Sequence, residues 1–325
     1  MIAGKGMFIW NAWNTESGDA ARALEVAKSA GLTHVLVKIA DGVLAFNVRD
    51  GRDYAAEFAH TFREGGLTVY GWQYIYGQNP EKEAEVAIKR IYECGVDGFV
   101  VNAEAEYKNK PKQAEQYMKK LRDELGSGFP IGLSSYRFPN LHREFPFNAF
   151  LKYCDFNLPQ VYWMQDHNPR QQLESSLSQY RQSWLFQRPI VPTGAAFQEH
   201  GWRPTAREIY EFLDAAAQYC TGVNFWVWEH ARRYGDLWLA IQNYEWGTSE
   251  MNGLRLKVVA SRVNIRDRAS VSSSVIGVLL KDDLVLANDI YVESGNRVWI
   301  RHDKGWSAIV YDNIVLMKSV QQERR

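Results

Sequence analysis

The chain has 325 residues, 38 basic against 38 acidic side chains, and an aromatic content of 14% that includes 12 Trp and 17 Tyr. A formal charge of zero excludes a global field that would recruit nucleic acid or an anionic membrane, so partners must be recognised by local chemistry. The length exceeds one average domain and suits a large α/β barrel followed by a small module.

The sequence shows neither an N-terminal export signal nor a membrane-spanning segment. Residues 1–6 lead directly into a strand-like run, without a long apolar segment and cleavage site. No stretch is apolar over the length needed to cross a bilayer. We therefore expect a soluble product that, if it acts outside a cell, arrives there by lysis, as part of a particle or by a leaderless route.

Strand-like runs followed by amphipathic helical patterns recur eight times. The expected strands lie near 7–13, 33–40, 68–75, 98–104, 130–136, 156–163, 189–196 and 222–228. The expected helices lie near 20–30, 54–64, 80–94, 112–125, 148–154, 169–183, 205–220 and 235–246, the fifth being the weakest. This alternation predicts a closed (β/α)8 barrel. A doubly wound open sheet is the main rival, but no glycine-rich phosphate fingerprint follows the first strand.

The pattern changes after Trp246. Residues 247–253 are polar and turn-rich, as in a linker. Short alternating runs follow near 256–260, 263–266, 275–279, 284–292, 298–301 and 305–310, which predict a small all-β barrel. We divide the chain into a barrel (1–248), a linker (249–253), a β domain (254–317) and a frayed tail (318–325).

The second domain resembles the bacterial SH3 family over its whole length. The matching segments are Val263–Arg266, Ser272–Gly277, Trp299–Arg301 and Gly305–Ala308. The resemblance implies attachment to cell-wall glycan or peptide, or a protein-interaction role. The plain alternative is a passive structural appendage.

Three polar residues spaced two apart end the fourth predicted strand: Asn102, Glu104 and Glu106. That spacing places their side chains on one face of a strand. An acidic ladder at the exit of a buried strand costs desolvation free energy, which a purely structural strand has no reason to incur. The alternative is that Glu104 and Glu106 already lie in a solvated loop before Lys108 and have no function.

Reactive side chains of such barrels lie at the carboxyl ends of the strands, the region we call the mouth. Here the mouth combines aromatics, amides and a few acids, a composition that favours stacking against sugar rings. It shows no metal-ligand spacing and no nucleophile elbow, and basic residues are too scarce for phosphate substrates. No cofactor is expected. The candidates are Trp13, Asp41, Tyr74, Tyr76, Asn102, Glu104, Glu106, Tyr136, Gln160, Tyr162, Gln198, Glu199, Trp226, Trp228 and Glu229.

Several of these candidates have a plain alternative. Gln160 and Tyr162 share a strand face and either hold a sugar or fill the barrel interior. Trp226 and Trp228 share a face of the eighth strand and either lie under a sugar ring or pack in the core. Asp41 is explained as a turn residue before glycine. Glu229, beside His230 and Arg232, is explained as a salt-bridged residue at a helix start. The cysteines Cys94, Cys154 and Cys220 lie far apart in apolar helix-end contexts, which favours buried thiols over disulfides or metal ligands.

The segment Asp97–Glu104 resembles the fourth-strand signature of family 18 glycoside hydrolases, the chitinase-like barrels. The resemblance implies that Glu104 protonates the glycosidic oxygen and that Asn102 supports the acetamido group of the substrate. Val100 replaces another polar member of the signature. It also implies a tryptophan at the barrel floor under a sugar ring, a place that Trp226 or Trp228 would take.

A second resemblance is to family 25 lysozymes. Lys38–Gly42 resembles their Lys-x-x-Glu-Gly turn, and Asn102–Glu104 resembles their Asp-x-Glu pair. The chain departs from that pattern because Asn102 lacks a carboxylate and the first strand, Phe8–Asn11, lacks the expected aspartate.

These patterns favour a glycoside hydrolase acting on N-acetylated polysaccharide such as peptidoglycan or chitin. Because Asn102 replaces the partner carboxylate, a mechanism assisted by the substrate's acetamido group fits better than a two-acid mechanism. Glu104 would be the general acid, Asn102 and Tyr162 would orient the acetamide, and Glu106 is the reserve acid. Two alternatives are a sugar-binding barrel without turnover, and a structural or interaction protein of a phage or secreted particle.

Overall fold

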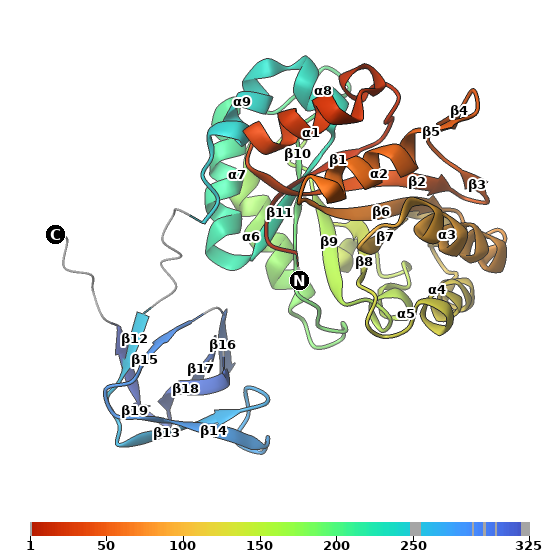
Figure 1. Ribbon diagram of the computed structural model, residues 1–325. Coiled ribbons are helices and arrows are strands. Elements are labelled where there is room, and N and C mark those ends of the chain that lie inside the picture. The colour runs from red at the N-terminus through yellow and green to blue at the C-terminus, as the bar shows by residue number, and fades with distance from the viewer. Residues whose placement is uncertain (1, 248–254, 288, 295–296, 303, 320–325) are drawn as a thin grey trace. The chain divides into compact units, whose positions relative to one another are not determined.

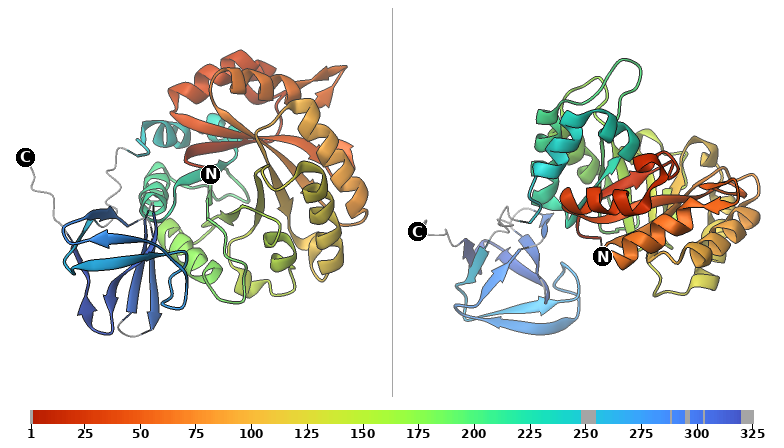
Figure 2. Two further views of the ribbon diagram at one scale, coloured as in Figure 1. Left: turned by 60° about the horizontal axis from the view of Figure 1, so that its bottom comes forward. Right: turned by 45° about the horizontal axis from the view of Figure 1, so that its top comes forward.

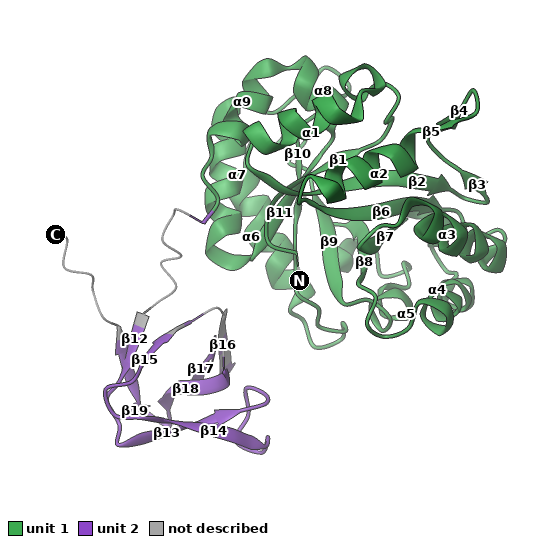
Figure 3. Ribbon diagram, in the orientation of Figure 1, with its two compact units in different colours: residues 1–246 green, residues 247–325 purple. Residues whose placement is uncertain are grey.

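The computed structural model describes residues 2–247, 255–287, 289–294, 297–302 and 304–319 (Figure 1). The contacts divide the chain into two compact units, Met1–Trp246 and Gly247–Arg325 (Figure 3). The predicted linker, 249–253, lies outside the described residues. Each unit is described by itself.

In the described part of the first unit, eight parallel strands form a closed barrel. They are β1 (Gly4–Ile9), β2 (Leu32–Asp41), β6 (Thr68–Ile75), β7 (Gly98–Ala103), β8 (Ile131–Tyr136), β9 (Phe156–Val161), β10 (Thr193–Ala195) and β11 (Gly222–Trp226). Each strand pairs with the next, β11 pairs with β1, and β1 also pairs with β2, which closes the sheet. The predicted (β/α)8 barrel is therefore confirmed, and closure excludes the doubly wound open sheet.

Helices surround the strands as an outer ring (Figure 2). They are α1 (Ala20–Ser29), α2 (Tyr54–Glu64), α3 (Pro80–Cys94), α4 (Pro111–Leu125), α5 (Phe147–Leu151), α6 (Pro169–Tyr180), α7 (Ala206–Tyr219), α8 (Trp228–Arg233) and α9 (Gly235–Asn243). Local signals set their ends. Asn79 caps α3 by accepting the Lys82 N–H, and Gly95 ends that helix in the left-handed conformation, with φ of 61°.

Short 3₁₀ turns and strands follow several of the barrel strands. The 3₁₀ turns are η1 (Thr15–Gly18), η2 (Ala105–Tyr107) and η3 (Pro139–Leu141). Between β2 and α2 the chain forms β3 (Leu44–Ala45), which pairs antiparallel with β2, and the two-stranded hairpin of β4 (Val48–Arg49) and β5 (Arg52–Asp53). These short strands were not predicted.

The period of two along each strand sorts side chains between two cores. In β7, Phe99, Val101 and Ala103 pack against the helices, whereas Val100 packs inside the barrel. The inner core is rich in large rings: Phe8, Tyr70, Trp72 and Phe156 are all buried there. Polar residues replace apolar ones on the inner face at the carboxyl end of β7, where Asn102 follows Val100.

Three strands end two or more residues before the predicted bound, and β10 begins at Thr193 instead of residue 189. β1 ends at Ile9 instead of Trp13, β9 at Val161 instead of Trp163, and β11 at Trp226 instead of Trp228. In each case aromatic residues continue past the last strand residue, because they pack in turns or helix starts, and hydrophobicity alone does not mark where pairing stops. The prediction that Trp228 lies on the eighth strand is therefore wrong, since Trp228 begins α8.

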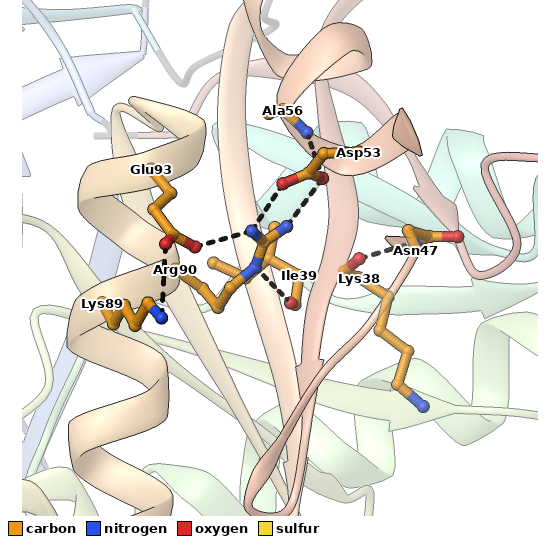
Figure 4. A network of polar contacts seen from close by, with 8 residues as sticks. All are labelled: Lys38, Ile39, Asn47, Asp53, Ala56, Lys89, Arg90 and Glu93. Atoms are coloured by element: carbon orange, nitrogen blue, oxygen red, sulfur yellow. Dashed lines mark hydrogen bonds and ion pairs between the residues drawn. The ribbon is translucent and has the colours of Figure 1, made fainter. Parts of the chain in front are cut away.

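A buried charge network holds the end of β2 (Figure 4). The register with β6 shifts between Lys38 and Ala40, a β-bulge at Ile39. Arg90 of α3 donates to the Ile39 carbonyl at 3.0 Å and to both carboxylate oxygens of Asp53 at 2.6 and 2.8 Å. The Lys38 side chain extends away from the guanidinium. The network therefore fixes a bulge that re-aims the last residues of β2.

The second unit contains only strands in its described residues. They are β12 (Arg255–Val258), β13 (Arg262–Arg266), β14 (Val275–Leu280), β15 (Leu284–Leu286), β16 (Asp289–Ser294), β17 (Arg297–His302), β18 (Gly305–Tyr311), β19 (Ile314–Val315) and β20 (Met317–Ser319). They form two antiparallel sheets, in the orders β15-β12-β20 and β14-β13-β18-β17-β16, with β19 on β18. A small apolar core of Val258, Ile265, Leu279 and Ile300 joins them. The predicted run 284–292 is split between β15 and β16, and β20 takes the first residues of the predicted tail.

Candidate active site at the mouth of the barrel

The polar residues at the end of β7 meet partners from β8 and β9. Gln160 donates its amide N–H to Glu104 Oε1 at 2.9 Å and to Asn102 Oδ1 at 3.1 Å. The same nitrogen lies 3.4 Å from Ser134 Oγ. Glu104 follows β7 directly and begins the η2 turn. The structure therefore brings together three residues that the sequence analysis placed at the mouth, and Ser134 is a neighbour that it missed.

Glu104 is held in a setting that favours its protonated form. Burial raises the pKa of Glu104, and the charge of Glu106 raises it further, while hydrogen bonds from Gln160 and Asn102 oppose part of this rise. The side chain is only half-buried, so it can still exchange protons. A carboxyl group that stays protonated above the usual range is suited to general acid catalysis.

Tyrosine hydroxyls surround the two glutamates. Tyr74 of β6 donates to Glu106 Oε2 at 2.6 Å. Burial and the charges of Glu104, Glu106 and Glu144 raise the pKa of Tyr136 to about 12. Burial, followed by the charges of Glu104 and Glu199, raises the pKa of Tyr162 well above its ordinary value. All three tyrosines therefore remain hydrogen-bond donors near neutral pH.

A tryptophan, Trp226, lies at the carboxyl end of β11, where it packs with rings of the inner core. Trp226, at the end of β11, is half-buried and contacts Phe8, Trp72 and Trp10, with ring centroids 5.4, 5.4 and 5.9 Å away. The peptide bond that follows Trp226 is cis. Trp10 is 41% exposed and was missed by the sequence analysis. Its alternation with Phe8 was the available signal, because residues two apart share the inner face of β1.

The other two predicted tryptophans lie elsewhere. Trp13 is half-buried in the turn after β1, with its ring 5.6 Å from that of Phe46. Trp228 has no exposed surface; it packs against Trp238 at 4.9 Å and donates to Glu16 Oε1 at 3.1 Å. A fully buried ring has no face to offer a ligand. The alternative of core packing therefore describes Trp228.

Asp41 belongs to a second polar group on the β2 side of the mouth. Its carboxylate accepts from Tyr76 at 3.0 Å and pairs with the Lys38 ammonium at 3.2 Å. The Lys38 ammonium is buried and lies 4.2 Å from the ring of Phe46 and 4.9 Å from that of Trp72. Burial lowers the pKa of Lys38, against the opposing effect of Asp41. Asp41 ends β2, so it is more than a turn residue.

The remaining candidates occupy the rim and the last strand–helix joint. Gln198 and Glu199 are exposed in the segment after β10. Glu229 lies in the first turn of α8, as predicted, but in the described residues it makes no ion pair. Its carboxylate instead accepts the backbone N–H groups of Trp10 and Asn11 at 3.1 and 2.5 Å. It thereby fixes the backbone next to Trp10, and burial raises the pKa of Glu229.

Three further findings concern metal ligands, cysteines and membrane spans. Within the described ranges, no group of three or more His, Cys, Asp and Glu side chains could hold a metal ion. All three cysteines are free thiols, with Cys94 and Cys154 buried and Cys220 half-buried. Among the helices that the structure describes, none combines the length and apolar character of a membrane span.

Comparison with known proteins gives a likeness of structure alone. No protein-family model matches the chain, and no curated protein sequence matches it. Among solved structures, a chitinase from Bacteroides thetaiotaomicron has a TM-score of 0.56 at 12% identity, covering 78% of this chain and 98% of that one. The spore cortex-lytic enzyme SleL of Bacillus cereus has a TM-score of 0.53 at 10% identity, covering 75% of each chain. A family 18 N-acetylglucosaminidase from Paenibacillus barengoltzii has a TM-score of 0.51 at 12% identity, covering 74% of this chain and 99% of that one. At these identities the likeness supports the barrel fold.

Proposed function

We propose that the chain is a glycoside hydrolase that acts on N-acetylated cell-wall polysaccharide, either peptidoglycan or a chitin-like glycan. One observation carries the proposal: the half-buried carboxyl group of Glu104, with its raised pKa, is hydrogen-bonded at the end of β7 near the mouth of the barrel. The solved barrels of the same fold include proteins described as chitinases and as a spore cortex-lytic enzyme, which supports the same substrate class.

The proposed reaction uses the acetamido group of the substrate as internal nucleophile. Glu104 gives its proton to the glycosidic oxygen as the bond from that oxygen to C1 breaks, and the acetamido oxygen bonds to C1. The leaving sugar departs with the proton as a hydroxyl group. Glu104, now a carboxylate, takes a proton from water, whose oxygen attacks C1 and displaces the acetamido oxygen. One water is consumed, and Glu104 is protonated again.

The neighbours of Glu104 have distinct roles in this proposal. Asn102 and Tyr162 orient the acetamide, and their fixed dipoles stabilise the positive charge that develops on it. Gln160 holds Glu104 and Asn102 in place. Trp226 offers its ring to the sugar. Trp13, Asp41, Tyr74 and Tyr136 are further binding residues, and Glu106 is the reserve acid.

The decisive assay measures new reducing ends after incubation with purified peptidoglycan and with chitin oligomers. Glu104→Gln should lower kcat by a factor of about 10²–10⁴. The matched control is Glu115→Gln, a carboxylate on α4 that pairs with Lys152 on the outside of the barrel. Full activity in Glu104→Gln, or equal cleavage of glycans that lack the acetamido group, contradicts this mechanism.

A barrel that binds sugar without turnover is the second candidate. The amide of Asn102, where a catalytic pair would have a carboxylate, favours it. Its signature is saturable binding of chitin oligomers by the wild type, weakened by Trp226→Ala, with no reducing ends formed on any substrate. Absence of both binding and turnover would leave a structural or interaction role, such as a component of a phage or secreted particle.

We further propose that the C-terminal unit attaches the barrel to the wall, as its resemblance to bacterial SH3 modules implies. It exposes several apolar side chains, such as those of Ile276 and Leu280. Removal of residues 250–325 should reduce co-sedimentation with cell walls and leave cleavage of short soluble oligomers unchanged. Equal sedimentation of the truncated chain argues for a passive appendage.

A further inference from the structure

A second carboxylate, that of Glu106, reaches the mouth beside Glu104. The η2 turn begins one residue after β7 and carries Glu106 beyond the strand. Tyr74 reaches the same place from β6, where it pairs in register with Asn102. The Tyr74 hydroxyl donates to Glu106 Oε2 at 2.6 Å. Two different elements therefore define the position of this carboxylate.

The negative charge of Glu106 has no basic partner in the part of the chain that the structure describes. The nearest lysines in sequence have other partners. Lys108 pairs with Glu144 at 2.7 Å, and Lys110 donates to the Tyr76 carbonyl at 3.2 Å. After burial, the charge of Glu106 is among the causes that raise the pKa of four groups: Glu104 after β7, Tyr74 on β6, Tyr76 just past the end of β6, and Tyr136 on β8. None of them carries positive charge, so the charge of Glu106 remains available to a cationic group at the mouth.

Glycoside cleavage creates such a cationic group. The sugar ring passes through an oxocarbenium-like transition state, and with substrate assistance the positive charge spreads onto the acetamide. A fixed negative charge near this position stabilises the transition state more than the neutral substrate. Asn102 cannot supply it, because an amide is neutral.

We propose that Glu106 is the counter-charge for this transition state, and that Tyr74 is the residue that positions it. The inference rests on the proposed function and changes the part assigned to Glu106, from a spare acid to an electrostatic stabiliser that transfers no proton. In an Asp-x-Glu pair the second carboxylate lies two residues before the glutamate, where this chain has Asn102. Here Glu106 supplies the second carboxylate from two residues after Glu104.

The kinetic test compares Glu106→Gln and Tyr74→Phe with a matched pair outside the mouth. Tyr153 donates to Glu115 at 3.2 Å and gives the control variants Tyr153→Phe and Glu115→Gln. Glu106→Gln should lower kcat by about 10²–10³ with little change in KM, because the interaction forms in the transition state. Tyr74→Phe should lower kcat by about tenfold alone and by nothing further in the Glu106→Gln background. The control variants should keep wild-type kinetics.

A gain-of-function arm tests the position of the charge. Asn102→Asp should restore part of the activity lost in Glu106→Gln, since it returns a carboxylate to the mouth of the barrel. Failure of this rescue, with both variants folded by thermal denaturation, would show that charge at the mouth is not what Glu106 supplies.

A binding arm works without turnover. The probe is an iminosugar analogue of N-acetylglucosamine that is cationic at neutral pH, compared with its neutral lactam. Glu106→Gln should weaken binding of the cationic probe by a factor of about 10²–10³ and leave the affinity for the neutral lactam unchanged. The inference is overturned if the variant loses affinity equally for both probes, or if it loses no affinity for the cationic probe. The two proposals fail separately: activity lost in Glu104→Gln but kept in Glu106→Gln removes only the counter-charge, whereas full activity in Glu104→Gln removes the proposed acid.

Discussion

The barrel interior holds polar side chains at both ends, and the two ends differ in their access to solvent. At the amino end, the imidazole Nε2 of His34 on β2 lies 2.7 Å from the Asn224 amide oxygen on β11, and its Nδ1 lies 2.9 Å from Thr33 Oγ1. At the carboxyl end, Gln160 bonds to Glu104 and Asn102. Burial disfavours the charged form in both places: it lowers the pKa of His34 to about 4 and raises that of Glu104.

The difference between the ends is access. His34 is buried beneath the large rings of the inner core, with the Tyr70 ring 6.1 Å away. Its neutral form is satisfied by neutral partners, so it contributes to stability. Glu104 is half-buried at the open end, where a proton held by the same desolvation can pass to a substrate. The same physical effect therefore yields a structural pair at one end and a candidate acid at the other.

The largest expected effect is on activity, and it should appear only when the carboxyl end of the barrel is changed. Glu104→Gln should lower kcat by a factor of about 10²–10⁴ and leave the unfolding midpoint nearly unchanged, because the amide keeps the shape of the carboxyl group. His34→Gln should leave kcat nearly unchanged at a temperature where the variant is folded. Reducing-end kinetics and thermal denaturation of both variants check this. A large loss of kcat in His34→Gln would mean that the two ends are coupled.

The next effect is on stability. His34→Ala removes a buried ring and leaves Asn224 without its partner, which should cost about 3–5 kcal/mol of unfolding free energy. Urea unfolding at pH 7 measures it. The matched control is His60→Ala, since His60 is exposed on α2 and pairs with the exposed Glu64; it should change stability by less than about 0.5 kcal/mol. A similar small loss for both variants would contradict the structural role of His34.

The pH dependence of stability should follow from the same group. His34 has a folded pKa of about 4, below its ordinary value of 6.5, so the unfolded chain binds the proton more readily. This stabilising contribution is complete above pH 6.5 and is lost as the pH falls toward 4. It amounts to about 3 kcal/mol.

Comparison with a variant isolates this contribution, because the raised pKa values of Glu83, Glu104 and Glu229 act in the opposite direction. The unfolding free energy of the wild type, relative to that of His34→Gln, should fall between pH 6.5 and pH 4. A constant difference over this range would show that His34 titrates normally.

The smallest effect concerns the hydrogen bond to the candidate acid. Gln160→Leu removes a donor that favours the ionised form of Glu104, so the pKa of Glu104 should rise further. The alkaline limb of the pH profile of kcat/KM should then move upward by about one unit or less. Gln172→Leu on α6, which removes an amide bonded to Asp166, is the control and should leave the profile in place. A downward shift would mean that Gln160 does not act on the ionised carboxylate.

Elements with strong local signals were predicted closely. β6, α2 and α3 have the predicted bounds, 68–75, 54–64 and 80–94. Each helix has a clear start, with Asp53 accepting the Ala56 N–H and Asn79 preceding Pro80. The bounds were less accurate where a strand is followed by buried aromatics, as after Ile9 and Trp226. There the local composition is the same on both sides of the last paired residue.

The candidate site was predicted in part. Alternation along one strand indicated that Asn102 shares a face with the residues near the strand end, and the general placement of strand ends indicated Tyr74, Tyr136, Gln160 and Trp226. Trp10 and Lys38 were not selected. Trp10 was passed over because the first strand was extended to Trp13, and Lys38 because a lysine inside a barrel is explained only by its ion pair with Asp41 and by the rings around it.

Local pattern by itself determined the alternation of strands and helices, the inward or outward direction of each strand residue, and the presence of an acidic ladder after the fourth strand. It could do so because period and capping depend on neighbours in the chain. Only the tertiary structure decided which side chains meet: Gln160 with Glu104, Tyr74 with Glu106, and Trp10 with Trp226. Those contacts depend on barrel closure, strand register and the bulge in β2, which bring residues up to 216 positions apart within reach. The acidity of Glu104 was likewise decided there, because burial and neighbouring charge are properties of the folded environment and not of the residue.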